Sequence, residues 1–186
     1  TTGLSAYSSA PFTVTFPSTQ VIDATSFGSK VDFTTGTSPY STAIGDIDGD
    51  GKPDLVLTNS GSNSVSVYRN TSTSGSIAAG SFAAKVDFTT GTTPYSGAIG
   101  EIDGDGKLDL AVANYGSATV SIFRNTSTSG SITAGSFASK IDFITGSIPT
   151  SVALGDIDGD GKPDLSVTNN TSNTVSVFRN TSTSGS

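Results

Sequence analysis

Short runs of alternating apolar and polar residues recur along the chain and predict β-strands rather than helices. In residues 164–169 (DLSVTN), Leu165 and Val167 alternate with polar side chains, so the apolar residues share one face of a strand. Stretches rich in Gly, Asn, Ser and Thr separate such runs and are typical of tight turns. The four strands predicted in this part of the chain are residues 139–143, 151–157, 164–169 and 174–180.

The same set of runs recurs every 55 residues. The segment GDIDGDGKPDL at Gly45 returns as GEIDGDGKLDL at Gly100 and as GDIDGDGKPDL at Gly155. Four short strands per unit predict an all-β fold of three tandem four-stranded blades like those of a β-propeller. A parallel β-solenoid is the competing architecture, although its coils are usually shorter. The predicted organisation is one continuous array: an extension over residues 1–21, then repeats over 22–76, 77–131 and 132–186.

Each repeat contains a short acidic loop whose like charges need a compensating cation. Carboxylates occupy loop positions 1, 3, 5 and 9, and glycines at positions 4 and 6 permit a sharp turn. Hard oxygen ligands in this number suit Ca²⁺, and the lysine at position 7 would add its backbone carbonyl. The sequence therefore predicts about one Ca²⁺ per repeat, three per chain. The predicted ligands are Asp46, Asp48, Asp50, Lys52 and Asp54; Glu101, Asp103, Asp105, Lys107 and Asp109; and Asp156, Asp158, Asp160, Lys162 and Asp164.

Two other readings of the loop are less favoured. An EF-hand needs a glutamate at position 12 and flanking helices, but that position holds Leu57, Val112 or Val167 within a predicted strand. A metal-free Asp/Gly turn is the plainer alternative. It does not explain why the three loops hold 12 of the 16 acidic residues. The second loop begins with Glu101 instead of aspartate, and this longer side chain is expected to alter that site.

Composition and charge exclude several classes of function. The chain lacks Cys, His, Met and Trp, so disulfides, thiolate metal sites and a histidine base are absent. A formal net charge of −7 argues against binding to nucleic acid or an anionic membrane, and three Ca²⁺ ions would bring it to −1. No apolar run is long enough to insert across a membrane. Without an asymmetric pair of catalytic groups, the chain is predicted not to be an enzyme.

The loop pattern DxDGDGxxDL, preceded by AIG or ALG and followed by an alternating strand, resembles FG-GAP/VCBS repeats. The resemblance covers residues 22–186 and implies blades of integrin-alpha-like β-propellers, with Ca²⁺ in the loop after each innermost strand. It also implies a secreted or cell-surface module for structure, adhesion or carbohydrate binding, with glycans or cell-surface proteins as further partners. Such propellers usually close with about seven blades, whereas this chain has three. The absence of Met, even at position 1, indicates a processed product or a fragment.

Other recurring residues have mainly structural interpretations. Lys30, Lys85 and Lys140 each stand two residues before an aspartate, which predicts solvated ion pairs along a strand. The arginines that end a strand in each repeat are expected to bond neighbouring carbonyls; they are Arg69, Arg124 and Arg179. Tyr40 and Tyr95 are candidate platforms for a sugar, with packing between blades as the alternative. The N-x-S/T patterns begin at Asn70, Asn125, Asn169, Asn170 and Asn180 and matter only in a glycosylating secretory route.

Counting strands predicts head-to-tail association with further copies of the chain. The segments 81–88 and 136–143 each complete the preceding blade, but no such segment follows the third. Residues 29–33 are an equivalent outer strand with no blade before them, so we expect them to complete the last blade of a neighbouring copy. The alternating residues 11–16 are a candidate second donor strand. Head-to-tail association of two chains could close into a six-bladed ring, but we prefer an open filament. The alternative to association is that the chain is a segment of one longer propeller.

Overall fold

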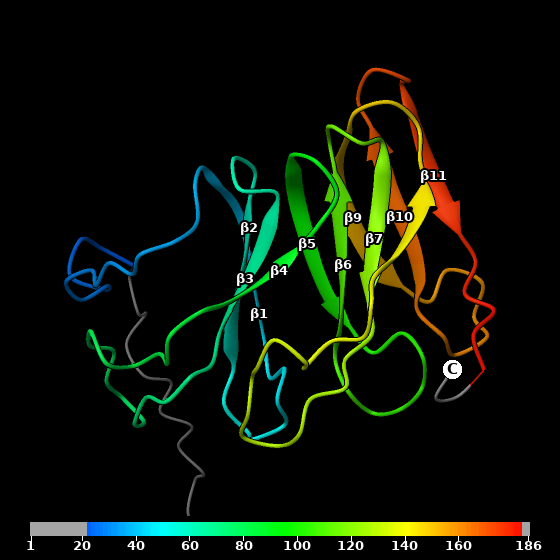
Figure 1. Ribbon diagram of the computed structural model, residues 1–186. Helices are drawn as coiled ribbons and strands as arrows, with labels where there is room; N and C mark the ends of the chain where they lie inside the picture. Colours follow the sequence, from blue (N-terminus) through cyan, green and yellow to red (C-terminus); the bar gives the residue numbers. More distant parts are fainter. Residues whose placement is uncertain (1–21, 184–186) are drawn as a thin grey trace, which may run out of the picture. The chain divides into compact units, whose positions relative to one another are not determined.

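The computed structural model describes residues 22–183 and contains strands but no helix over that range (Figure 1). The first sheet has the order β1 (Pro39–Gly45), β2 (Asp54–Asn59), β3 (Ser64–Tyr68), β4 (Val86–Thr89). The second has the order β5 (Pro94–Gly100), β6 (Asp109–Asn114), β7 (Thr119–Phe123), β8 (Ile141–Ile144). The third has β9 (Pro149–Gly155), β10 (Asp164–Asn169) and β11 (Thr174–Phe178). All neighbouring strands are antiparallel.

The predicted all-β class is confirmed, and the prediction of four strands per blade holds for two of the three sheets. In the first sheet β4 comes from the start of the second 55-residue repeat, and β8 stands in the same relation to the second sheet. Over residues 22–183 the third sheet has three strands, and the three sheets do not close into a ring. Val31–Phe33, the counterpart of β4 and β8, is not in a strand. Strand exchange between chains therefore stays a prediction.

The chain divides into two units, residues 1–30 and residues 31–186, and all described strands belong to the second. In the described part of the first unit, a turn joins the amide of Ser26 to the carbonyl of Asp23 at 3.0 Å. The candidate donor strand over residues 11–16 lies outside the described residues. The predicted repeat boundaries at 76 and 131 do not coincide with sheet boundaries, because each fourth strand crosses from one repeat into the previous sheet.

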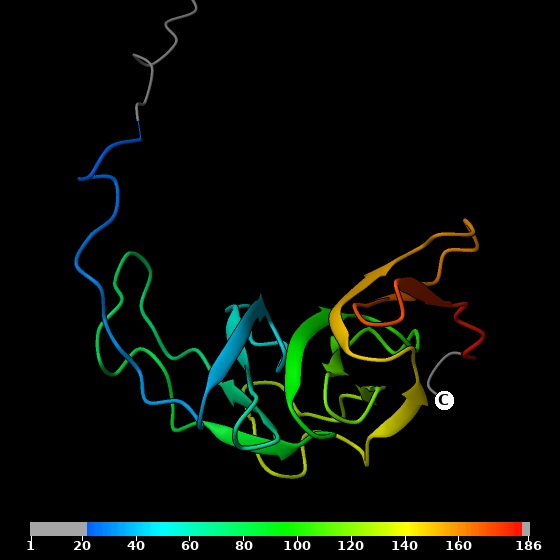
Figure 2. The same cartoon turned by 90° about the horizontal axis from the view of Figure 1, so that it is seen from above.

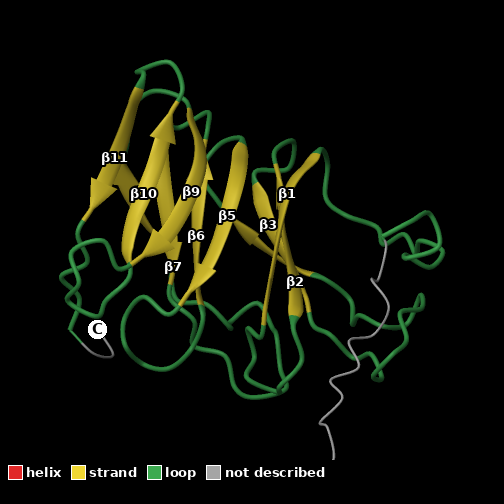
Figure 3. Ribbon diagram, turned by 180° about the vertical axis from the view of Figure 1, so that it is seen from behind, coloured by secondary structure: helices red, strands yellow, loops and turns green. Residues whose placement is uncertain are grey.

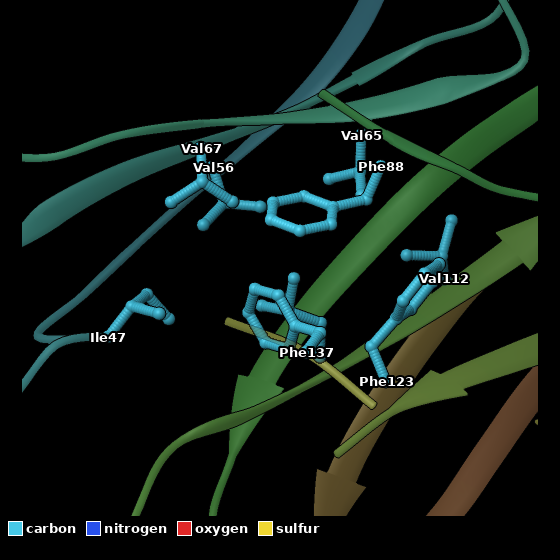
Figure 4. Close-up of a cluster of buried hydrophobic side chains, with 9 residues drawn as sticks. Ile47, Val56, Val65, Val67, Phe88, Val112, Phe123 and Phe137 are labelled. Carbon is cyan, nitrogen blue, oxygen red and sulfur yellow. The ribbon is translucent and has the colours of Figure 1, made fainter. Parts of the chain in front are cut away.

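The three sheets follow one another face to face, with the innermost strands β1, β5 and β9 side by side (Figure 2). The middle sheet has apolar residues on both faces, so it packs against one sheet on each side. Leu110 and Val112 of β6 face the first sheet, and the intervening Ala111 and Ala113 face the third. The cluster between the first two sheets is drawn in Figure 4 and includes Ile47, Val56, Val65, Val67, Phe88, Phe123 and Phe137.

The outer face of the third sheet has no fourth sheet packed on it within the described chain. Val175 and Val177 of β11 are more than half exposed, whereas their counterparts Val65 and Val67 are fully buried between the first two sheets. The sequence of the third repeat thus carries the same apolar face as the first, and nothing in the described part of the chain covers it.

The recurring Lys–Asp pattern forms the predicted ion pair in the second and third repeats. Lys85 contacts Asp87, and Lys140 contacts Asp142, with each lysine standing directly before the strand that holds its aspartate. Asp87 also accepts a hydrogen bond from Ser66 across the sheet at 2.5 Å. Burial raises the pKa of Asp87, but the bonds from Lys85 and Ser66 outweigh it and leave that pKa below its ordinary value.

Candidate metal-binding loops

The three acidic loops connect β1 to β2, β5 to β6 and β9 to β10, and they lie at the same end of the three sheets (Figure 3). Each loop is wrapped around its first carboxylate. In the first loop, Asp46 accepts hydrogen bonds from the amides of Asp50 (3.1 Å) and Gly51 (2.9 Å). Gly49 and Gly51 have φ of +66° and +88°, which only glycine adopts freely. The turn expected from the glycine positions is therefore present.

Three of the four predicted carboxylates in each loop come together. In every group, one oxygen from each residue lies within 4.8 Å of the others. The groups are Asp46, Asp48 and Asp50; Glu101, Asp103 and Asp109; and Asp156, Asp158 and Asp164. The predicted carboxylate ligands outside these groups are Asp54, Asp105 and Asp160. The three clusters could each hold a metal ion, and the predicted ligand sets stay predictions.

The carboxylate at position 9 also has a structural role that the loop pattern does not reveal. Asp54 is fully buried; one of its oxygens accepts the amide of Ile47 at 3.0 Å and the other the amide of Asn70 at 2.8 Å. It therefore ties the start of the loop to the end of β3. Burial raises the pKa of Asp54 and of its counterpart Asp109, whereas the bond from Asn180 lowers the pKa of Asp164.

Two buried carboxylate oxygens provide a test of whether a cation fits these loops. Asp48 and Asp103 are 3% and 6% exposed, and the Oδ2 atom of each has no hydrogen-bond partner among the described residues. Burial raises the pKa of Asp48, and the charge of Asp50 raises it further. A buried carboxylate without a partner is costly, and a divalent cation would remove that cost. The donors are all oxygens in a flexible loop, which suits Ca²⁺ better than Mg²⁺. The residues present therefore fit Ca²⁺.

The lysine at position 7 points its ammonium group away from the carboxylates in two of the loops. Lys107 Nζ donates to the carbonyl of Ser127 at 2.9 Å, and Lys162 Nζ donates to that of Ser182 at 2.5 Å. The Lys52 amide donates to Asp50 in the first loop at 2.9 Å. The backbone carbonyls of the three lysines stay predicted ligands.

The arginines at the strand ends contact the loops rather than neighbouring carbonyls, so that prediction is wrong for two of them. Arg69 lies 3.6 Å from Asp50 Oδ2, and Arg179 forms ion pairs with Asp158 (2.5 Å) and Asp160 (3.0 Å). The contact with Asp158 raises the pKa of Arg179. The third loop therefore has an internal cation beside it, with which a metal ion would compete.

Each of the first two loops is held from outside by the repeat that follows it. The Asn125 side chain donates to the carbonyl of Ile47 at 2.7 Å, and Ser127 Oγ donates to the same oxygen at 3.1 Å. Asn180 and Ser182 hold the Ile102 carbonyl in the second loop at 2.7 and 3.1 Å. We call this pair of bonds from an N-T-S segment the loop clamp.

Sequence reasoning missed the loop clamp, although a signal for it exists. The N-T-S segments recur with the same 55-residue period as the loops, but the sequence alone identifies them only as N-x-S/T glycosylation patterns. Asn125 is fully buried, and Asn169 nearly so, with their side chains engaged in hydrogen bonds. Neither side chain is open to a glycan in this fold.

The candidate sugar platforms stack on one another. The rings of Tyr40 and Tyr95 lie 3.9 Å apart and nearly parallel, and Tyr115 stacks on Tyr95 at 4.2 Å. Tyr95 therefore has both ring faces covered by protein, which favours the packing interpretation over a sugar site at this residue.

Comparison with known protein families connects this geometry to a described repeat. The model of the FG-GAP-like repeat matches residues 46–112 and again residues 101–167. Each match begins at the first carboxylate of one acidic loop and runs through the whole of the next loop. A search of curated proteins gives no match. Within residues 22–183, no helix has the length and apolar character needed to cross a membrane.

Proposed function

Because this chain belongs to the FG-GAP-like repeat family, we propose that it is a calcium-stabilised structural or adhesive module that assembles head to tail with copies of itself. FG-GAP repeats suggest a β-propeller fragment of the adhesion type and are typically extracellular and non-enzymatic. The finer proposal, that this chain is secreted and works through its assembly rather than through catalysis, draws on its acidic loops and its unfinished last sheet.

Calcium has a structural role in this proposal. Asp48 and Asp103 would use their unpartnered oxygens as ligands, together with the carboxylates grouped around them. Bound Ca²⁺ supplies the positive charge that lets these carboxylates pack together, so that its binding free energy becomes folding free energy. The loop clamp then passes the order of one loop to the next repeat.

The single observation that carries the assembly proposal is the unfinished third sheet. The first and second sheets gain their fourth strands, β4 and β8, from the repeat that follows. In the third sheet, β11 pairs only with β10 among the described strands, which leaves an open edge. Val31–Phe33 has the sequence of a fourth strand but forms none. Addition of this segment to β11 of a neighbouring copy would complete both.

Such a contact is heterologous and therefore makes a ring if its rotation closes and a filament if it does not. Two chains would supply six blades, which is within the range of closed propellers. We favour a filament, because the joint between copies would repeat the joint between adjacent repeats of one chain. In a filament of this kind every joint, within or between chains, has the same construction.

Deletion of residues 1–33 tests the proposal, with static light scattering of the full and shortened chains over a range of concentrations. The full chain should increase in mass with concentration, and the shortened chain should remain monomeric. Far-UV circular dichroism verifies that the shortened chain keeps its strands. A shortened chain that assembles as the full chain does, or a full chain that stays monomeric, would rule out strand exchange. The monomeric result would favour a segment of one longer propeller.

Carbohydrate binding is the second candidate function. The feature that favours it is the Tyr40 ring, which stacks on Tyr95 with one face and is exposed on the other. A glycan-array screen of the calcium-loaded chain distinguishes the two. Glycan binding that a Tyr40→Ala substitution abolishes would support the carbohydrate-binding function. The absence of binding above background would exclude it and favour the structural module.

A further inference from the structure

A trio of aromatic residues occurs twice along the chain, 55 residues apart. Phe137 lies edge-on against Phe88 with ring centroids 4.9 Å apart, and Phe123 lies 6.2 Å away (Figure 4). In the preceding repeat, Phe82 meets Phe33 at 5.1 Å and Tyr68 at 6.3 Å in the same edge-on manner. Each trio contains one aromatic residue at the end of a third strand, one phenylalanine of a fourth-strand sequence, and the phenylalanine of a Ser-Phe pair that follows the third strand in the sequence. In this order the residues are Tyr68, Phe33 and Phe82 in one trio, and Phe123, Phe88 and Phe137 in the other.

Backbone hydrogen bonds hold the incoming phenylalanine in register. Phe82 forms a β-bridge with Asn70. On one side of the bridge the amide of Ala83 donates to the carbonyl of Arg69 at 2.9 Å, and on the other the amide of Thr71 donates to the carbonyl of Ser81 at 2.8 Å. Phe137 forms the same bridge with Asn125, flanked by equivalent bonds. The phenylalanine and the N-T-S segment therefore belong to one repeated joint.

At the third position, two members of the trio are present and the third is missing. Phe143 and Phe178 lie 5.9 Å apart and line a cavity of about 310 Å³. Ile122, Ile141 and Leu165 contribute apolar walls, and residues 179–182 form its rim. An apolar cavity of roughly 150 Å³ is enough to bind benzene, so this one has room for a phenylalanine ring. Among the described residues, none supplies that ring.

Phe27 is the phenylalanine that this cavity lacks. It stands 55 residues before Phe82 and 110 before Phe137 in the same S-F context, and it is 82% exposed. We infer that the cavity beside Phe143 and Phe178 binds Phe27 of a second copy of this chain. This inference rests on the proposed head-to-tail assembly and identifies its anchor. Ser26 and Gly28 of the incoming copy would then pair with Thr181 and Arg179, as Ser81 and Ala83 pair with Thr71 and Arg69.

The same joint would complete the third metal loop. Ile157 is 60% exposed, whereas Ile47 at the same place in the clamped first loop is 2% exposed. The incoming copy carries Asn70 and Ser72 at the positions of the clamp residues Asn125 and Ser127. Once Phe27 is seated, these two side chains reach the Ile157 carbonyl as their counterparts reach Ile47. The third loop is thus ordered by assembly, and the first two loops by their own chain.

Phe27→Ala in the full chain tests the anchor, with Tyr7→Ala as a control at another aromatic residue of the N-terminal segment that has no counterpart in the repeats. Light scattering and sedimentation velocity measure the concentration at which each chain assembles in excess Ca²⁺. Loss of a buried aromatic anchor should raise this concentration by about thirty-fold or more, and Tyr7→Ala should leave it unchanged. On the cavity side, Phe143→Ala should act like Phe27→Ala, whereas Ile144→Ala, on the other face of the same strand, should not.

A peptide measurement separates failure of the anchor from failure of assembly. A labelled peptide of residues 22–35 is titrated with the Phe27→Ala chain, whose cavity is intact, and its anisotropy is followed. The peptide should bind, and the same peptide with alanine at position 27 should bind at least about thirty-fold more weakly. Equal binding of both peptides, with the 1–33 deletion still monomeric, would overturn the anchor while leaving assembly in place. A deletion that assembles normally would overturn both.

Discussion

The side-chain amide of Asn125 donates a hydrogen bond to the backbone carbonyl of Ile47, which lies 2.7 Å away and 78 residues earlier in the chain. A second bond from the same amide reaches the carbonyl of Leu108 at 2.8 Å. One buried side chain therefore connects two successive acidic loops. The order of each of the first two loops depends in part on the repeat that follows it.

Asn125→Ala should lower the free energy of unfolding by about 1–3 kcal/mol, because the Leu108 carbonyl loses the donor from Asn125 and the Ile47 carbonyl keeps only the bond from Ser127. The matched control is Asn70→Ala. Within one chain the Asn70 side chain donates to the carbonyl of Pro53 at an exposed position, so its loss should cost clearly less. Urea unfolding of both variants at concentrations where the chain is monomeric makes the comparison. Equal losses would show that the clamp across repeats contributes nothing.

Gly91→Ala should destabilise the second sheet by about 1–3 kcal/mol through overpacking. A Cβ atom at this position would lie 2.4 Å from Ser117 Oγ and 2.7 Å from the Asn114 side chain, which accepts the Gly91 amide. Gly80→Ala is the control, since a Cβ there meets nothing within 4 Å. Thermal unfolding should show a lower midpoint for the first variant only, and an unchanged midpoint for Gly91→Ala would mean that the turn relaxes freely.

Asp103→Asn should remove one bound Ca²⁺ per chain, because Asp103 supplies a buried and unpartnered oxygen to its group. Asp105→Asn, outside that group, should retain the same number of ions with a smaller loss of affinity. Calorimetric titration gives the stoichiometry. Hydrogen exchange should locate the loss of protection in the second sheet and its neighbours, since repeat arrays couple mainly through adjacent units. Identical titrations for both variants would contradict the assignment.

Asp87→Asn should reduce stability near neutral pH and have less effect in acid. The pKa of Asp87 lies below its ordinary value of 3.8 in the folded chain. Its contribution is therefore complete above that ordinary value and is lost as the pH falls through the folded pKa. Urea unfolding of the wild type and the variant from about pH 7 to pH 2 measures the difference. A difference that stays constant, or grows toward low pH, would show that the ion pair with Lys85 does not set this pKa.

The local sequence predicts the strands and the turns of this protein well, because each depends on neighbours in the chain. The alternation in residues 164–169 matches β10, and the glycines of the first loop have the positive φ that its turn needs. The order of sheets also follows from the 55-residue period. These features need no information about distant contacts.

Contacts across repeats could not be read from the same pattern. The Asn125 clamp joins groups 78 residues apart, and nothing in the N-T-S segment alone distinguishes a buried donor from an exposed one. The four carboxylates of a loop look alike in sequence, yet Asp54 accepts the backbone amides of Ile47 and Asn70, while Asp48 keeps an oxygen without a partner among the described residues. Both side chains are buried, so their hydrogen-bond partners, which the sequence does not show, separate their roles.

Thermal unfolding of the same preparation in excess Ca²⁺ and in excess chelator tests the central claim most directly, with Mg²⁺ as the control cation. If the carboxylates of the three loops pack around Ca²⁺, chelation should lower the unfolding midpoint by at least about 10 °C, and added Ca²⁺ should restore it. Mg²⁺ at the same concentration should restore less of it. An identical midpoint in chelator and in Ca²⁺ would contradict a calcium-stabilised fold.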